Sequence, residues 1–307
     1  MEYGSFESKS FIGKMVIFGA IIFVSSTFFS LIGILLLGLM YGASGVQVVL
    51  GNNLTNLNAL KLIQILQTTG IFIIPAILSA FLFSKKPWSY LCFEKVKFQT
   101  ILKTFIIVLI SLPAINLLAS INQLIPMSDW MVEMERKAEA ITKAFLLTDS
   151  IWAYLVNILM IAILPAVGEE LIFRGILQRR LVEYTRSRWV GILLAAALFS
   201  AIHMQFQGFI PRFALGVAFG YLLEVTGSIW VPIFAHFFNN AIAATGYMLI
   251  GTGTVDERIE DIGGLSDLWL LGIISLIATI LLVVKLKREI ERNRQLEQPR
   301  DSAIEQR

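Results

Sequence analysis

Three ionisable residues lie inside an apolar stretch that is long enough to cross a membrane. The stretch runs from Ile151 to Leu177, and Glu169, Glu170 and Arg174 interrupt it. A charged group at the centre of a membrane helix costs roughly 2.5 to 3.5 kcal/mol on the insertion scale. Residues of this kind are therefore paired, or they face a wet and functional site. The fold of this chain therefore has to provide partners or a wet site for three ionisable residues of one helix.

Helical spacing separates the expected roles of these three residues. Glu170 and Arg174 are four positions apart, so in a helix they project from nearly the same face and can form a structural ion pair. Glu169 points elsewhere and has no basic residue three or four positions away. Its carboxylate is available to bind and deprotonate a water molecule. The alternative is that all three residues are buried polar groups that fix helix packing.

The composition indicates a membrane protein. The chain has 307 residues, of which 56% are hydrophobic and 15% are charged, and its mean hydropathy is +0.75. A soluble globular protein has more charge than this. The net charge of +3 is small and its basic residues lie in expected loops, so we expect no nucleic-acid partner. The single cysteine, Cys92, excludes an internal disulfide.

Apolar runs of about 20 residues can each span a hydrocarbon core of ~30 Å. We place eight of them, at 15–41, 62–83, 102–125, 152–177, 189–206, 209–225, 229–250 and 268–285. The expected fold class is therefore all-α: a polytopic membrane helical bundle with about eight transmembrane helices. We expect one membrane domain over 15–285 with its motif core at 150–245, a cytoplasmic N-terminal segment at 1–14 and a charged cytoplasmic tail at 286–307.

The basic residues predict an orientation. With eight spans, four basic clusters fall on one side, which the positive-inside rule assigns to the cytoplasm. They lie at 9–14, 85–97, 179–188 and 285–294. We thus expect a multi-pass protein of the cell (inner) membrane with both termini in the cytoplasm and an acidic loop, 256–267, on the other side. In the tail we expect a frayed helix followed by disorder.

Residues 130–145 have the pattern of an amphipathic helix. Apolar residues recur there at helical spacing, and charged residues occupy the other faces. We expect this helix to lie along the membrane surface. It can either cover the entrance to a substrate site or serve only as a surface connector.

The chain has two histidines, His203 and His236, and both fall in expected spans. Asn240 shares a helix face with His236, because it lies four positions further on. With Glu169, three spans each direct polar groups into the bundle. Prolines lie four residues before Glu169 and His236, and they predict bends that would make room for a water-filled site.

Three short motifs resemble those of one protease family. In order along the chain they are Glu169-Glu170-x-x-x-Arg174, Phe199-x-x-x-His203 and His236-x-x-x-Asn240. Together they resemble the CPBP family, which comprises type II CAAX prenyl proteases and the bacteriocin-processing or abortive-infection membrane proteases. The resemblance covers about residues 150–245.

The resemblance implies an intramembrane endopeptidase. Glu169 and His203 would activate a water molecule, while His236 and Asn240 would stabilise the oxyanion of the tetrahedral intermediate. Its partners would be the lipid bilayer and membrane-bound protein or peptide substrates, which can be prenylated, signal-like or peptide precursors.

Several alternatives remain at this point. The family has been described as both glutamate-dependent and metal-dependent; a zinc site would use Glu169, His203 and His236, but no H-E-x-x-H motif is present, so we favour a reaction with no cofactor. A non-enzymatic transporter, immunity protein or scaffold could keep the polar site for binding. The sequence 42–45, Gly-Ala-Ser-Gly, matches a serine-protease motif, but a flexible turn is the better interpretation.

Overall fold

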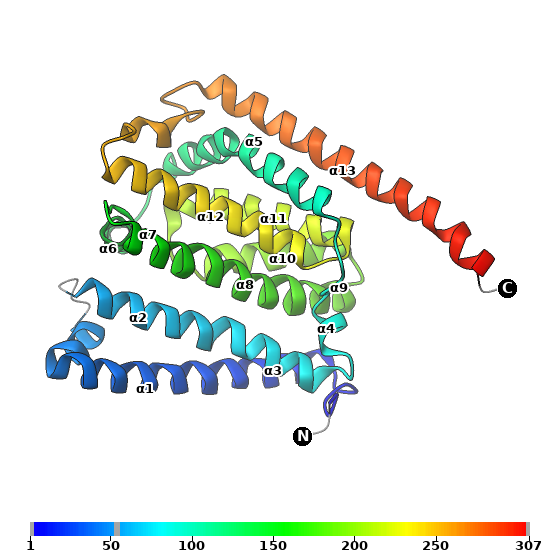
Figure 1. Cartoon of the computed structure of the whole chain (residues 1–307), viewed down its shortest axis with the longest axis horizontal. Coiled ribbons are helices and arrows are strands. Elements are labelled where there is room, and N and C mark those ends of the chain that lie inside the picture. Colours follow the sequence, from blue (N-terminus) through cyan, green and yellow to red (C-terminus); the bar gives the residue numbers. More distant parts are fainter. Residues whose placement is uncertain (1–2, 52–55, 305–307) are drawn as a thin grey trace.

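The structure is a computed structural model that describes residues 3–51 and 56–304. Within these residues every regular element is a helix (Figure 1). The helices are α1 (Phe11–Gly51), α2 (Leu57–Thr68), α3 (Ile74–Phe83), α4 (Pro87–Tyr90), α5 (Phe98–Gln123), α6 (Asp129–Leu146), α7 (Ile151–Asn157), α8 (Leu164–Glu170), α9 (Arg179–Thr185), α10 (Arg188–Ala201), α11 (Phe209–Thr226), α12 (Trp230–Gly251) and α13 (Trp269–Ile304). π-helical and 3-10 segments join some of them: η1 (Thr69–Ile73), η2 (Ile158–Ile163), η3 (Leu171–Gln178), η4 (Phe206–Gly208) and η5 (Glu257–Asp261).

The prediction of an all-helical, multi-pass membrane protein is confirmed. Among the described residues, seven helical segments are long and apolar enough to cross a membrane. They are Phe11–Val48, Leu57–Phe83, Phe98–Gln123, Ile151–Thr185, Phe206–Thr226, Trp230–Gly251 and Trp269–Leu296. The remaining predicted span corresponds to α10, which is shorter.

The fifth span is not the helix that the sequence predicted at 189–206. Helix α10 has 14 residues and ends at Ala201. At ~1.5 Å per residue it is ~21 Å long, which is less than a ~30 Å hydrocarbon core. The chain then turns through Met204, whose φ is 52°. His203 therefore lies in a turn inside the bundle and not on a helix.

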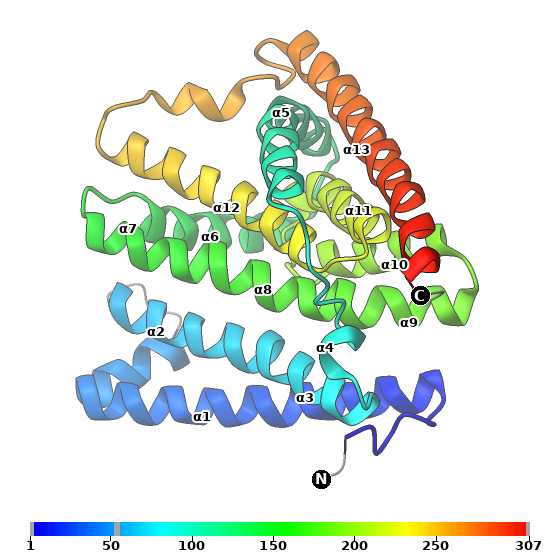
Figure 2. The same cartoon turned by 45° about the vertical axis from the view of Figure 1, so that its right-hand side comes forward.

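The helices are arranged in layers, with the long helical segment Ile151–Thr185 in the middle (Figures 1 and 2). On one side it packs against η1 and α3, behind which lies α1. On the other side it packs against α12 and α11, which in turn contact α5; α13 covers α5. The segment that carries Glu169 and Glu170 is thus enclosed by protein on both sides.

That central segment is helical throughout but irregular. Its α-helical parts alternate with the π-helical segments η2 and η3. The wide turn η2 ends two residues before Pro165, where the chain lacks a backbone N–H donor. The predicted irregularity near Pro165 is present. The bend predicted at Pro232 is wrong, because α12 begins at Trp230 and a proline in the first helical turn removes no helical hydrogen bond.

Basic residues from separate parts of the chain meet at one end of the bundle. Lys14 and Arg180 line one small cavity there, and Arg188 and Lys287 line another. Arg179 donates a hydrogen bond to the carbonyl oxygen of Tyr90, the last residue of α4. The four basic clusters thus share one end of the bundle.

Helix α1 is interrupted near its C-terminal end, and helix α13 extends far into the tail. At Gly42, α1 is interrupted by a residue with φ 63°, and the Ser44 hydroxyl donates to the carbonyl of Tyr41 at 2.7 Å. The turn expected over 42–45 is thus confined to Gly42, and residues 43–45 are helical. The disorder expected in the tail is wrong up to Ile304, because α13 continues to that residue. The frequent Lys, Arg, Glu and Gln residues there are good helix formers; residues 305–307 lie outside the described part.

The amphipathic helix predicted at 130–145 is α6. It packs beside α7 and α12 at the end opposite the basic clusters. The Asn157 side chain donates to the carbonyl of Phe145 at 2.6 Å, and Glu135 accepts a hydrogen bond from the backbone of Gln207 at 3.2 Å. These bonds attach α6 to η4 and to the start of the central segment.

Candidate active site

A cavity of about 620 Å³ lies within the bundle, between α6, α8, α11 and α12. The four residues that the motifs singled out for catalysis all line it: Glu169, His203, His236 and Asn240. They come from α8, from the turn after α10 and from α12. Packing of these elements therefore brings together side chains that are up to 71 positions apart in the sequence (240 − 169).

Glu169 is buried, and one oxygen of its carboxylate has no hydrogen-bond partner among the described residues. The residue is 8% exposed, and the oxygen without a partner is Oε2. The preceding residue, Gly168, packs so tightly on η1 that a Cβ there would lie 2.7 Å from the Cβ of Phe72. This close contact fixes the backbone beside Glu169. A buried carboxylate oxygen without a protein donor is suited to bind a water molecule.

Glu170 connects an arginine and a histidine. Its Oε2 lies 3.1 Å from Nε of Arg174, and its Oε1 lies 2.9 Å from Nδ1 of His236. The first contact is held by charge, because neither atom makes an aligned hydrogen bond. The predicted spacing thus produces the ion pair, but the link to His236 was not foreseen. Glu170 fixes the orientation of an imidazole at the cavity.

Arg174 is fully buried, and several groups surround its guanidinium. Its Nη2 donates to the carbonyl of Gly216 at 3.0 Å, and its Cζ lies 4.6 Å from the ring centroid of Phe199. Gln178 repeats the backbone contact one turn further on, donating to the carbonyl of Gly220 at 3.1 Å. Both glycines belong to the G-x-x-x-G of α11, whose bare backbone lets η3 approach.

In both histidines the same ring nitrogen, Nδ1, is hydrogen-bonded to an oxygen. In His203, Nδ1 lies 2.8 Å from the carbonyl oxygen of Phe199. A carbonyl can only accept, so Nδ1 carries the proton and Nε2 of a neutral ring is left as an acceptor. In His236, Nδ1 donates to Glu170 in the same way, and its ring stacks on Phe219 at 5.3 Å. Each Nε2 is thus the nitrogen that remains for chemistry.

Asn240 is held by its neighbours. Its Nδ2 donates to the carbonyl of Ile161 at 3.0 Å, and its Oδ1 accepts from Asn239 at 3.1 Å. Ile161 is the residue whose carbonyl an α-helical residue 165 would bind, and Pro165 has no N–H. The Asn240 amide replaces that missing donor. One N–H of the amide group remains for a ligand.

Arg212 and Gln205, which belong to none of the three motifs, also line the cavity. The two guanidinium ends of Arg212 donate to Gln205, to its side-chain oxygen at 2.7 Å and to its carbonyl at 2.6 Å. The sequence contains a signal for Arg212, because it is an ionisable residue inside the predicted span 209–225. Glu169 is singled out by the same feature in its own span. Arg212 adds a positive charge to a cavity that contains an acid.

The proposed zinc ligands do not form a ligand cluster. Glu169, His203 and His236 line the same cavity, but among the described residues no three His, Cys, Asp or Glu side chains lie close enough to hold a metal ion. The side chains as arranged do not fit a zinc site, so we derive no step through a metal. Cys92 lies away from this cavity, where burial raises the pKa of its thiol.

The fold and this cavity define a class: multi-pass helical membrane proteins with ionisable residues enclosed in the bundle. Residues 150–242 match the family described as type II CAAX prenyl endopeptidase Rce1-like. The resemblance drawn from the three motifs is thus confirmed for this region, which runs from the start of α7 into α12.

Two curated relatives, both from Bacillus subtilis (strain 168), match over part of their length. The "Putative membrane peptidase YdiL" is 35% identical over 92 residues, which is 30% of this chain and 37% of that protein. The "Uncharacterized protein YpbD" is 32% identical over 92 residues, which is 29% of this chain and 44% of that protein. The matches therefore cover less than half of either relative. No solved structure matches the chain.

Proposed function

We propose that this protein is an intramembrane endopeptidase that hydrolyses peptide bonds in membrane-associated proteins or peptides. The observation that carries this proposal is the shared cavity: a buried Glu169 with an unbonded carboxylate oxygen faces the same space as two imidazoles and an amide. The match of residues 150–242 to CAAX-type endopeptidases supports it.

The proposed reaction begins with a water molecule bound by Glu169 and His203. The carboxylate, assisted by Nε2 of His203, takes a proton as the water oxygen attacks the substrate carbonyl carbon. The C=O bond becomes a C–O⁻ single bond in the tetrahedral intermediate. When the C–N bond breaks, the same acid returns the proton to the leaving amine. The products are a carboxylic acid, which retains the second proton of the water and then loses it to solvent, and an amine.

His236 and Asn240 would stabilise the oxyanion of that intermediate. The free N–H of the Asn240 amide is one donor, and Nε2 of His236 is the other when the ring is protonated. Glu170 orients that ring, because its carboxylate lies 2.9 Å from Nδ1. Arg174 holds Glu170, so it acts on the site through its neighbour and does not contact the substrate.

The test uses purified protein and a peptide with a membrane-proximal scissile bond. We expect Glu169→Gln and His203→Ala to lower turnover by at least about 100-fold, the usual contribution of a general acid or base. Glu257→Gln, which removes an exposed carboxylate from the acidic loop, serves as the charge-matched control and should keep full activity. Unchanged turnover in either cavity variant would refute the mechanism.

The rival function of this site is binding without hydrolysis, as in a transporter or scaffold. It predicts that the wild-type protein retains the peptide intact after prolonged incubation, and that Glu169→Gln alters the affinity only. Cleavage that depends on Glu169 would exclude that function. The two proposals are therefore separated by one product measurement.

We further propose that hydrolysis proceeds without a metal ion. The support is the arrangement of the three candidate ligands, which do not converge as a set. Activity should then survive dialysis against a strong chelator, with bound zinc far below one equivalent per chain. Stoichiometric zinc, together with activity that returns only when zinc is added back, would overturn this.

The location and the substrates are also proposals. We propose the cell (inner) membrane, with both termini in the cytoplasm, from the basic end of the bundle. Prenylated, signal-like and peptide-precursor substrates all remain candidates. Comparing the membrane proteins of cells that express the wild type with those that express Glu169→Gln should identify the substrate as the species that accumulates in the variant.

A further inference from the structure

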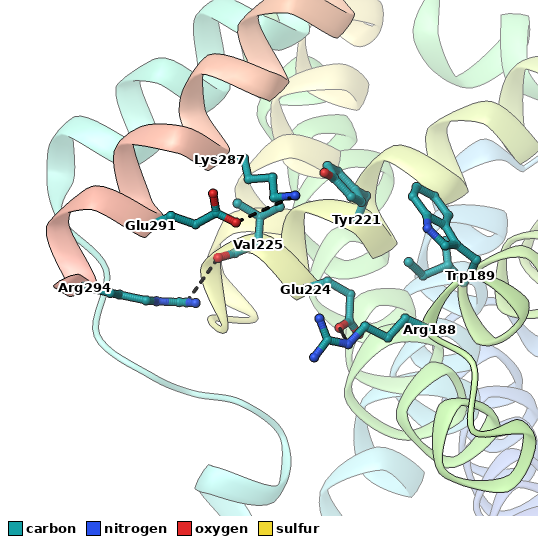
Figure 3. A pocket seen from close by; sticks show the side chains of 9 residues that line it. Arg188, Trp189, Tyr221, Glu224, Val225, Lys287, Glu291 and Arg294 are labelled. Carbon is teal, nitrogen blue, oxygen red and sulfur yellow. Dashed lines mark hydrogen bonds and ion pairs between the residues drawn. The ribbon is translucent and has the colours of Figure 1, made fainter.

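A second and smaller cavity, of about 260 Å³, lies at the basic end of the bundle. It is formed by the start of α10, the end of α11 and the C-terminal half of α13 (Figure 3). Arg188, Lys287 and Arg294 line it together with two acids, Glu224 and Glu291. Basic side chains from distant parts of the sequence thus converge on a small hollow outside the proposed active site.

Two of the basic side chains are only loosely paired. Nε of Arg188 lies 4.0 Å from Glu224, with 81% of the arginine side chain exposed. Nζ of Lys287 lies 3.7 Å from Glu291 and is 44% exposed. Pairs this long and this exposed contribute little to stability. Both cations can therefore turn towards an incoming anion without breaking a strong contact.

The third basic residue has a structural task. Nη2 of Arg294 donates to the carbonyl oxygens of Val225 and Thr226, at 3.1 and 3.0 Å. These carbonyls belong to the end of α11, where the helix leaves them without helical partners. Arg294 thereby holds α13 against α11 and keeps its positive charge at the edge of the cavity (Figure 3).

One wall of the cavity is aromatic. The rings of Trp189 and Tyr221 are stacked, with centroids 5.4 Å apart and planes at 13°. Tryptophan and tyrosine are enriched where a membrane protein meets the headgroup layer. On the adjoining helices, Leu193 and Leu194 of α10 and Leu281 of α13 are exposed apolar residues. The hollow thus lies between a charged end and apolar helix surfaces.

We propose that this cavity binds the phosphate group of an anionic phospholipid. Arg188 and Lys287 would contact the phosphate, the Trp189–Tyr221 pair would lie at the glycerol level, and the acyl chains would follow the exposed leucines of α10 and α13. A basic hollow between membrane helices suits such a headgroup. The bound lipid would link α10 to α13, two helices that otherwise meet mainly through α11.

The test measures lipid binding to the full-length protein in a neutral detergent. Dioleoyl phosphatidylglycerol, dioleoyl phosphatidylcholine and inorganic phosphate are titrated separately, and both the thermal midpoint and the number of bound lipids by native mass spectrometry are recorded. The pocket variant is Arg188→Gln with Lys287→Gln. The matched control is Lys86→Gln with Lys95→Gln, which removes two exposed lysines from the same end of the bundle.

We expect phosphatidylglycerol, and not phosphatidylcholine, to raise the midpoint of the wild type and of the control. The pocket variant should bind phosphatidylglycerol about tenfold or more weakly, since each basic residue near a membrane surface adds about 1 kcal/mol. Glu224→Gln should bind it more tightly, because a repelling carboxylate is gone.

Three results would overturn the proposal. Equal losses in the pocket variant and the control would mean that general surface charge is responsible. Equal stabilisation by phosphatidylcholine would remove the requirement for an anionic lipid. Stabilisation by millimolar inorganic phosphate but not by phosphatidylglycerol would assign the site to a soluble phosphate instead of a lipid. None of these outcomes depends on whether the protein cleaves peptides.

Discussion

At the scale of single residues, the best-defined feature is the buried side-chain network Arg174–Glu170–His236. Glu170 is 0% exposed and lies within 3.1 Å of both partners. Taking a carboxylate and a guanidinium out of water is expensive, and removing one partner leaves the other charge uncompensated. This side-chain network therefore determines both the packing of the central helix and the orientation of the His236 imidazole at the cavity.

Arg174→Ala should mainly lower stability. We expect a loss of about 3 to 5 kcal/mol, the usual effect of breaking a buried ion pair, because the Glu170 carboxylate would lose its charged neighbour. The measurement is denaturant unfolding in detergent micelles. Arg174→Lys, which keeps the charge but not the planar fork that reaches Gly216, should recover only part of the loss. A variant that unfolds like the wild type but cleaves nothing would mean that Arg174 takes part in the chemistry.

At the scale of helices, the central segment depends on two compensations for an irregular backbone. Pro165 removes a donor from the turn that contains Ile161, and the side chain of Asn240 on α12 supplies one. Gly168 allows α8 to lie directly against η1. Both features concern how the helix that carries Glu169 meets its neighbours, and each can be tested by stability.

Asn240→Ala should destabilise the protein by about 0.5 to 1.5 kcal/mol, because the Ile161 carbonyl would lose the hydrogen bond from the Asn240 amide. Pro165→Ala restores a backbone N–H in that turn. In the double variant the two changes should therefore be non-additive, with the Asn240→Ala penalty reduced by at least about 0.5 kcal/mol. Thermal unfolding of all four proteins provides the cycle. Strict additivity would show that Asn240 does not substitute for the missing donor.

Gly168→Ala should cost about 1 to 3 kcal/mol, because the added methyl group would lie 2.7 Å from the Cβ of Phe72. Gly246→Ala on α12 is the matched control. A Cβ at that position meets nothing within 4 Å, so the higher helix propensity of alanine should leave stability unchanged or slightly raised. If both variants unfold alike, the contact between α8 and η1 is looser than the structure indicates.

At the scale of the whole molecule, charge is distributed unequally between the two ends of the bundle. The basic clusters and both chain termini lie towards one end, while α6, η4 and the acidic loop lie at the other (Figures 1 and 2). The proposed active site is between them. This asymmetry is the basis of the proposed orientation, which rests on the positive-inside rule.

Reporter fusions provide the topology test. A reporter that is active only in the cytoplasm should give a signal at both termini and none when inserted at Gly253, in the segment after α12. The reason is that translocating the clusters at 9–14 and 285–294 is unfavourable. A signal at Gly253, or its absence at one terminus, would contradict the proposed orientation. Protease protection of spheroplasts offers an independent control.

How much the sequence reveals depends on how local each interaction is. The Glu170–Arg174 pair follows from a four-residue spacing within one helix, and the apolar runs of the expected spans recur as helices with shifted ends. His203 shows the limit. Its apolar surroundings predict that it lies within a span, but α10 ends at Ala201. Apolar composition alone does not indicate the turn through Met204.

The sequence by itself determined the helical class, the grouping of basic residues and the three motifs, because each depends on composition or on spacing along one helix. Only the tertiary structure decided that Glu170 binds His236, 66 positions away, that Asn240 replaces the donor missing at Pro165, and that Arg212 faces the cavity. These contacts join different helices. Their geometry depends on how the helices pack, and no local pattern records that.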